Sequence, residues 1–274
     1  MNKPCGRYDA VLQNVLQEVL DAAHRAGAPQ VSLERMLVHL IEDDSVRAVL
    51  AACIPQAGIM TLGDELRAMV AARLAAELAR LDRESGRRKR SKAVLPRSMP
   101  IGIAWIDAWL DRRAALDPQL SVALRCAVAR VSGAGRPADC LAVLVTIVDK
   151  TTGAAANALL GRGLDRYELA CRVAYGEPTS SAGQENIVPS DSASLALVLL
   201  DDDYTTMAFV VEALEAVMAI PTDQAQLMML RTHREGRVVV AELPAAAARV
   251  KSGGFERFGR ERCEPLRVRL ELPS

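Results

Sequence analysis

Three consecutive carboxylates and a histidine are the residues whose types and spacing could support chemistry. Asp201, Asp202 and Asp203 follow an apolar run and precede a run with helical spacing. Such carboxylates can accept hydrogen bonds from a cation, or they can be solvated charges near the positive end of a helix. His233 follows Met229 by one helical turn, so an imidazole and an apolar side chain share one helix face. These residues leave cation binding, metal-assisted hydrolysis and a structural role open.

The surrounding text predicts the elements that position these residues. "LALVLL" (195–200) indicates a buried strand, 206–218 has apolar residues at helical spacing, and Thr222 begins a helix that ends at Gly236. "RVVVAEL" and "LRVRLEL" indicate two further strands, and Pro244 begins a helix between them. The order β, α, α, β, α, β over about 80 residues predicts a small α+β domain whose short sheet is covered by helices.

The upstream text is helical from Tyr8 to about residue 83 and again over 120–174, with Ser32 as an expected N-cap. Between these stretches, about 83–118 forms an insertion that contains a basic run, "RRKRSK", and a short helix with Trp105 and Trp109. We expect the basic run to be solvated and assign it no role. The polar, Gly/Pro/Ser-rich stretch 176–194 predicts a linker, so the domains are 1–175 and 195–274.

Composition excludes several partners. The net charge is +0 and aromatic residues make up 3% of the chain, so neither nucleic acid nor an anionic membrane is an expected partner. No apolar stretch has the length of a membrane span, and the first ten residues lack the pattern of a signal peptide. The six cysteines form no CxxC pair, so we expect packing cysteines, no metal site and a cytoplasmic protein.

Residues 195–274 resemble the ClpS adaptor family. The resemblance rests on "VLLDDDYTTMAFVVEAL", "MMLRTHREGRVVV" and "PLRVRLE". It implies a non-enzymatic, cofactor-free adaptor that binds proteins beginning with a bulky hydrophobic residue (N-degrons) and delivers them to a ClpA- or ClpC-like AAA+ unfoldase and its peptidase. An α-amino group carries three donors, so its receptor requires acceptors that converge beside an apolar hole.

The resemblance also implies roles for individual residues. Asp201, Asp202 and His233 would hold the α-amino group. The first side chain would enter a pocket formed by residues of both helices and of the last strand, namely Thr205, Met207, Val210, Met229, Thr232 and Leu266. Thr205 would in addition serve as the N-cap of the helix. Met207 is associated with excluding β-branched first residues, so Phe, Leu, Tyr or Trp would be favoured.

The sequence departs from the family pattern at three places. Asp201 replaces the usual Asn, which removes a donor and increases attraction for an ammonium group. Ala246 replaces the acidic residue on the surface that docks on the unfoldase, whereas Lys251 matches the basic one. Gly253 and Gly254 are expected to interrupt the long family helix, since Gly costs about 1 kcal/mol relative to Ala inside a helix.

The first module, 1–175, resembles the all-helical, pseudo-duplicated N-terminal domain of Clp unfoldases. "SLERMLVHLIEDDSVRAVLAAC" and "ADCLAVLVTIVDKTTGAAANALL" form a weak internal repeat at an offset of roughly 107 residues. No phosphate-binding GxxxxGK[ST] motif is present in the sequence. The sequence therefore predicts no ATPase activity. Because the first module resembles the docking domain of the unfoldase, the alternative to a delivering adaptor is a regulator or decoy, in which this module covers the docking surface of the ClpS-like domain in cis.

Overall fold

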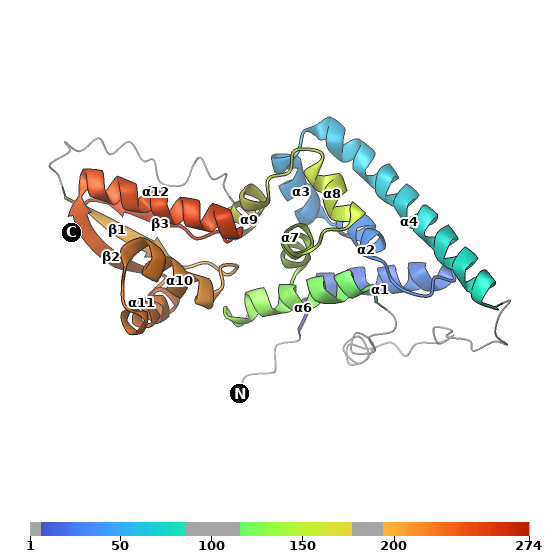
Figure 1. The fold of residues 1–274 in the computed structure, drawn as a ribbon, viewed down its shortest axis with the longest axis horizontal. Coiled ribbons are helices and arrows are strands. Elements are labelled where there is room, and N and C mark those ends of the chain that lie inside the picture. Colours follow the sequence, from blue (N-terminus) through green and yellow to red (C-terminus); the bar gives the residue numbers. More distant parts are fainter. Residues whose placement is uncertain (1–6, 86–115, 177–193, 274) are drawn as a thin grey trace. The chain divides into compact units, whose positions relative to one another are not determined.

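The computed structural model describes residues 7–85, 116–176 and 194–273 (Figure 1). Contacts divide the chain into two compact units. The first comprises residues 1–129 and 137–164, and the second comprises 130–136 and 165–274. Segments upstream of the predicted boundary at 176 thus belong to the same unit as the C-terminal sheet. The insertion residues Trp105 and Trp109, the basic run and most of the predicted linker lie outside the described residues.

The first unit is helical, as predicted. Its helices are α1 (Ala10–Arg25), α2 (Leu33–Leu40), α3 (Asp44–Cys53), α4 (Gln56–Ser85), most of α6 (Pro118–Ser132), α7 (Cys140–Lys150) and α8 (Ala154–Leu160). The predicted N-cap at Ser32 is confirmed, because its hydroxyl oxygen accepts a hydrogen bond from the Arg35 N–H at 3.2 Å. Helix α7 is buried along most of its length and forms part of the core of this unit.

Two short backbone bridges join the beginnings of four helices in this unit. Tyr8 pairs with Ala138, and Val31 pairs with Leu116. In each bridge the residue before one helix contacts the residue before another: Asp9 N–H donates to the Ala138 carbonyl at 2.9 Å, and Asp117 N–H donates to the Val31 carbonyl at 2.9 Å. The bridge between the beginnings of α1 and α7 therefore corresponds to the bridge between the beginnings of α6 and α2. The equivalent residues, Tyr8 and Leu116 or Val31 and Ala138, are separated by about the offset of the sequence repeat.

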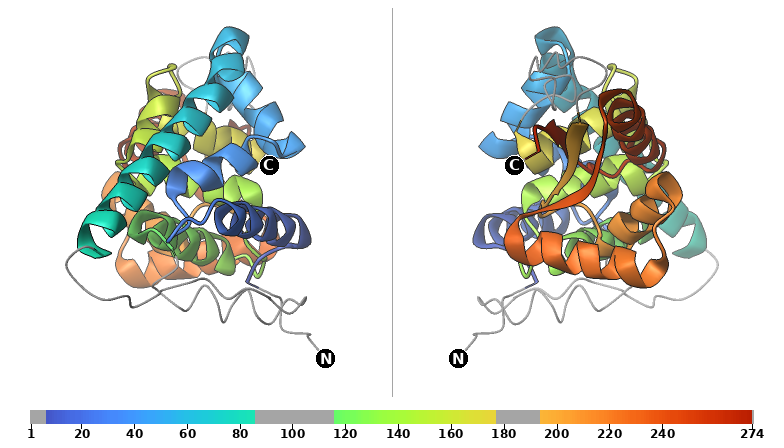
Figure 2. Two further views of the ribbon diagram at one scale, coloured as in Figure 1. Left: turned by 90° about the vertical axis from the view of Figure 1, so that its right-hand side faces the viewer. Right: turned by 90° about the vertical axis from the view of Figure 1, so that its left-hand side faces the viewer.

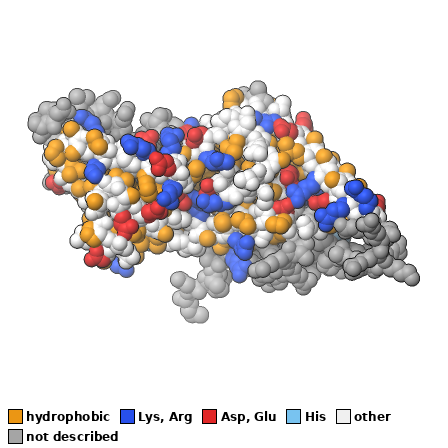
Figure 3. Space-filling model, viewed as in Figure 1, with side chains coloured by type: hydrophobic (Ala, Val, Ile, Leu, Met, Phe, Trp, Pro, Cys, Tyr) orange, Lys and Arg blue, Asp and Glu red, His pale blue; other side chains and the backbone are white. Residues whose placement is uncertain are grey.

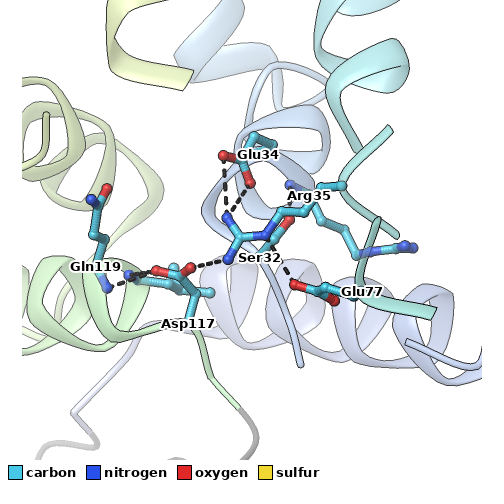
Figure 4. A network of polar contacts seen from close by, with 8 residues as sticks. Ser32, Glu34, Arg35, Glu77, Asp117 and Gln119 are labelled. Atoms are coloured by element: carbon cyan, nitrogen blue, oxygen red, sulfur yellow. Dashed lines mark hydrogen bonds and ion pairs between the residues drawn. The ribbon is translucent and has the colours of Figure 1, made fainter. Parts of the chain in front are cut away.

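A partly buried ionic network holds α2, α4 and the beginning of α6 together (Figure 4). The Arg73 guanidinium contacts Glu34 at 3.0 Å, Glu77 at 3.2 Å and also Asp117. Burial alone would lower the pKa of Arg73, but its bonds with Asp117 and Glu77 and the charge of Glu34 raise it overall. Asp117 additionally accepts the Gln119 N–H at 2.7 Å, so the same carboxylate caps α6.

The second unit contains the predicted α+β domain. Its elements are β1 (Ser194–Leu200), α10 (Met207–Met218), α11 (Thr222–Glu235), β2 (Arg237–Pro244), α12 (Ala245–Arg262) and β3 (Val268–Glu271), and α9 (Arg166–Tyr175) joins them. The predicted order of strands and helices is confirmed. The strands, drawn as arrows in Figure 2, form one antiparallel sheet. Its order is β2-β1-β3, with a register shift between Leu197 and Val198 in the pairing of β1 with β2.

Helices α10, α11 and α12 pack against this sheet around an aliphatic core with two phenylalanines. Phe255 is fully buried, and Phe209 stacks on Phe258 with ring centroids 5.3 Å apart. Central strand β1 is buried on both faces, whereas β2 alternates between buried and exposed residues. The loop after β1 is therefore attached to the most enclosed strand of the unit.

The predicted interruption at Gly253 and Gly254 is wrong, because α12 continues to Arg262. Two glycines of this helix, Gly254 and Gly259, allow close packing, whereas a Cβ on Gly253 would meet no atom within 4 Å. A Cβ on Gly254 would lie 3.0 Å from a Val217 methyl group, and one on Gly259 would lie 2.8 Å from the Glu264 carbonyl oxygen. The cost of Gly in a helix is offset here by close approach to α10 and to the turn after α12.

The described cysteines at positions 53, 126, 140, 171 and 263 carry free thiols. Burial raises the pKa of Cys140 and of Cys171 to about 12, so both are inert packing residues. Basic and acidic side chains are interspersed over the part of the face drawn in colour in Figure 3. None of the described helices is by itself long and apolar enough to cross a membrane, although the bent pair α7 and α8 passes that test by length and composition.

Candidate functional site

The three aspartates lie in the loop 201–206 between β1 and α10. The Asp201 N–H donates to the carbonyl of Gly236, which caps α11 in the left-handed region, at 2.9 Å. On the preceding residue, the Leu200 N–H donates to the Arg267 carbonyl at 3.1 Å. The first bond brings the beginning of the loop to the end of α11, and so brings Asp201 close to His233, whereas the second bond joins it to the residue before β3.

Asp201 and His233 form the exposed polar pair of the loop. His233 Nδ1 lies 3.5 Å from Asp201 Oδ2, and the two side chains are 36% and 32% exposed. Partial burial raises the pKa of Asp201, His233 opposes this effect, and the neighbouring charges of Asp202 and Asp203 raise the pKa further. The pair therefore offers oxygen and nitrogen acceptors that solvent can reach.

Asp202 is an internal acceptor. Its Oδ1 accepts the N–H groups of Tyr204 at 2.8 Å and Thr205 at 2.6 Å. Its Oδ2 accepts the hydroxyl groups of Thr205 at 2.6 Å and Tyr175 at 2.7 Å. A carboxylate has about four acceptor positions, so these four donors fill it. Burial raises the pKa of Asp202, and the same hydrogen bonds counteract the rise.

The prediction that Thr205 caps the helix is wrong. The N-cap of α10 is Thr206, whose side chain makes no capping bond. Thr205 instead donates its hydroxyl to Asp202, since the turn places that carboxylate closer than the helix end. The Thr206 N–H is 3.5 Å from Glu264 Oε2, so a carboxylate that is 58 positions away in the sequence lies at the positive end of α10.

Two arginines neutralise the remaining carboxylates around the loop. Arg136 pairs with Asp203, and both side chains are partly exposed. Arg130 contacts Glu264 at 3.3 Å, with side chains only 5% and 10% exposed, and it also donates to the Tyr204 carbonyl at 3.3 Å. Both arginines lie in the 130–136 segment that belongs to the second unit.

The predicted pocket residues are distributed between the core and its edge. Leu266 is 4% exposed in the core cluster, and Val210 packs against that cluster. Thr232 is buried, and its hydroxyl donates back to the Met228 carbonyl at 2.8 Å. Met207 and Met229 are half-buried near the beginning of α10 and in α11, and these two helices pack together.

The predicted docking residues lie on α12, away from this loop in the sequence. Ala246 is exposed, as is Val250 one turn later. Lys251 Nζ donates to the Val217 carbonyl at 2.6 Å, so one of its three donors caps the C-terminal end of α10. The lysine therefore has a structural bond in addition to its predicted docking role.

Sequence reasoning missed four residues of this site: Arg130, Arg136, Tyr175 and Glu264. The only signal was indirect, since three adjacent carboxylates require donors or cations somewhere in the fold. For the metal-assisted alternative, no cluster of three or more His, Cys, Asp or Glu side chains within the described ranges has a metal-binding arrangement. That alternative receives no geometric support.

The part of the chain that forms the α+β domain matches a known protein family. Residues 191–269 match the family model described as "ATP-dependent Clp protease adaptor protein ClpS". The chain is 35% identical over 99 residues to the ClpS adapter of Wolinella succinogenes, covering 97% of that protein and 36% of this chain. The chain therefore belongs to the ClpS adaptor family, and its class is a Clp protease adaptor.

Other ClpS proteins are also similar to this chain. The ClpS adapters of Sodalis glossinidius and Vibrio cholerae are each 35% identical over 75 residues, which is 71% of each protein and 27% of this chain. A solved structure of Agrobacterium tumefaciens ClpS2 bound to L-phenylalaninamide is 31% identical, with a TM-score of 0.29, and the match covers 29% of this chain and 96% of that one. Each of these matches covers little more than a third of this chain or less.

Proposed function

We propose that this protein is a non-enzymatic, cytoplasmic Clp adaptor that binds N-degron peptides with a bulky hydrophobic first residue. The observation that supports this most directly is the Asp201–His233 pair at the end of α11, with contact at 3.5 Å and both side chains about one-third exposed. A solvent-accessible carboxylate attracts an ammonium group, and a neutral imidazole nitrogen can accept a hydrogen bond from another N–H of that group.

In this proposal Asp201 takes the role that Asn has in the family. A carboxylate gives a charge-assisted bond to the ammonium group, which is stronger than the neutral bond to an amide. Asp202 supports the loop from within, because its acceptor positions are already filled. The first side chain of the ligand would contact Met207, Val210, Met229, Thr232 and Leu266, so we expect Phe, Leu, Tyr or Trp to be favoured.

The partner is proposed to be a ClpA- or ClpC-like AAA+ unfoldase with its peptidase. The helical first module is proposed to be a pseudo-duplicated domain like the N-domain of these unfoldases. Its support is the pair of equivalent bridges, Tyr8–Ala138 and Val31–Leu116, at about the offset of the sequence repeat. The decoy alternative is not favoured, because the family model and the curated relatives that the chain matches are those of Clp protease adaptors.

The decisive experiment is fluorescence anisotropy with peptides that differ only in the first residue. Phe, Leu, Ile, Arg and Ser peptides are compared, each with a free and an acetylated amine. We expect binding by the free-amine Phe and Leu peptides and at least about tenfold weaker binding after acetylation, because acetylation removes the positive charge and two donors. Equal binding of free and acetylated peptides would refute amine recognition.

Docking is tested separately with Lys251→Ala. We expect about fivefold weaker binding to the isolated N-domain of a Clp unfoldase, the size expected for a charge on the rim of an interface. Binding of the Phe peptide should be retained. Arg257→Ala, an exposed cation on the same helix, is the matched control. Equal affinity of the Lys251 variant and the control would remove Lys251 from the docking surface.

A further inference from the structure

The fourth donor to Asp202 comes from a residue upstream of the segment matched by the family model. Tyr175 is the last residue of α9 and lies 27 positions before Asp202 in the chain, yet its hydroxyl is 2.7 Å from Asp202 Oδ2. The match to the family model begins at residue 191, so this donor lies upstream of the residues that the model matches. The other three donors to Asp202 come from the loop itself, from Tyr204 and Thr205.

The tyrosine is held in place by its surroundings. The Arg267 guanidinium lies over its ring at 4.9 Å, and Gly176 ends α9 directly after it in the left-handed conformation. Burial raises the pKa of Tyr175 well above its ordinary value, and the charge of Asp202 raises it further. The hydroxyl therefore stays protonated at neutral pH and remains a donor.

A second upstream segment contacts the same loop. Arg136 pairs with Asp203, and Arg130 donates to the Tyr204 carbonyl. A Cβ on Gly133 would lie 3.7 Å from the Met207 terminal methyl group, so the turn after α6 also adjoins the beginning of α10. The loop is thus held at three successive residues, Asp202, Asp203 and Tyr204, by side chains that lie upstream of the residues matched by the family model.

We propose that Tyr175 and Arg136 are positioning residues of the peptide site, so that segments upstream of the ClpS domain complete its amine-binding loop. This inference rests on the proposed function. Tyr175 fixes the Asp202 carboxylate and Arg136 neutralises Asp203, which leaves the Asp201 carboxylate to receive the ammonium group. The segments 130–136 and 165–175, which belong to the same unit as the sheet, are then components of the binding site.

Two substitutions test this in the full-length chain. Tyr175→Phe removes only the hydroxyl and keeps the ring under Arg267, and Arg136→Gln removes an exposed ion pair, so neither should prevent folding. Tyr167→Phe is the matched control, because it removes a hydroxyl from the same helix that interacts with Cys171 instead of the loop. The readouts are the affinity ratio of free-amine to acetylated Phe peptide and hydrogen exchange of the Tyr204 and Thr205 amides.

We expect Tyr175→Phe to lower the affinity ratio about fivefold and to speed exchange of the two amides by a similar factor, with a smaller effect from Arg136→Gln. The control should match the unmodified protein in both readouts. If Tyr175→Phe changed neither the exchange of the two amides nor the affinity ratio, the inference would be overturned. Tighter binding of the free-amine peptide by this variant would also overturn it, because Tyr175 would then obstruct the site. If no variant and no unmodified protein binds peptide, the proposed function fails, while the exchange rates still decide whether Tyr175 fixes the loop.

Discussion

Replacing Asp201 with alanine is expected to weaken binding of a free-amine Phe peptide by about 10- to 100-fold, because a hydrogen bond to a charged group contributes about 1.5–3 kcal/mol. Asp201 is the partly exposed carboxylate of the loop next to His233. The acetylated peptide should be affected little, because it carries no charge for Asp201 to attract. Anisotropy titration of both peptides measures the difference.

The pH dependence of binding provides a second readout for Asp201. Its pKa is raised by partial burial, so affinity should fall as the pH drops through a value above that of an ordinary aspartate. Affinity should also fall above about pH 8, where the peptide amine loses its proton. Asp201→Asn is expected to flatten the acid limb and keep the alkaline one. An acid limb unchanged in this variant would assign the titration to another group.

The control for both experiments is Asp223→Ala. Asp223 is an exposed carboxylate in the first turn of α11, the helix that carries His233. It changes the charge of the chain by the same amount as Asp201→Ala without altering the loop. If Asp223→Ala weakened binding as much as Asp201→Ala, the effect would come from the overall field of the protein and the assignment of Asp201 would be refuted.

Replacing Asp202 with alanine is expected to lower the free energy of unfolding by about 2–4 kcal/mol, because four partly buried donors lose their acceptor and water replaces only some of the bonds. Four donors converge on this carboxylate. The midpoint of urea unfolding, followed by circular dichroism, measures the loss. Peptide binding should fall as well, since the loop loses its internal support.

Asp202→Asn is the matched control for this prediction. The amide oxygen can still accept the Tyr204 and Thr205 N–H groups, and the two hydroxyl groups can turn to accept from the amide nitrogen. We expect a loss of less than about 1 kcal/mol, within the usual range for a single neutral hydrogen bond. A loss as small in Asp202→Ala as in Asp202→Asn would mean that the four bonds contribute little to stability.

The same pair of variants predicts a pH effect on stability. The folded pKa of Asp202 is raised by burial, so the folded state binds a proton more readily than the unfolded state. The contribution of this group to stability is therefore present at low pH and is lost as the pH rises through the folded pKa. Asp202→Asn should remove this part of the pH dependence. Identical stability–pH curves for both proteins would contradict it.

Local features of the structure could be predicted because they depend on neighbouring residues. The alternation of "LRVRLEL", the helical spacing after Met207 and the glycine after Glu235 each identify an element over a few residues. The motif around Asp201 and His233 identified the family, and the comparison with family models confirmed it. Gly253 and Gly254 misled the prediction, because the helix propensity of a residue is local, whereas the close approach of α10 to Gly254 is a tertiary contact.

The sequence alone therefore determined the elements of the C-terminal domain, their order and the carboxylates available to a ligand. Tertiary structure decided what each carboxylate does. Asp202 binds Tyr175, Asp203 binds Arg136 and Glu264 binds Arg130, across separations of 27, 67 and 134 positions. Adjacent aspartates are chemically alike, so only the donors brought to them by folding can distinguish a buried support from an exposed acceptor.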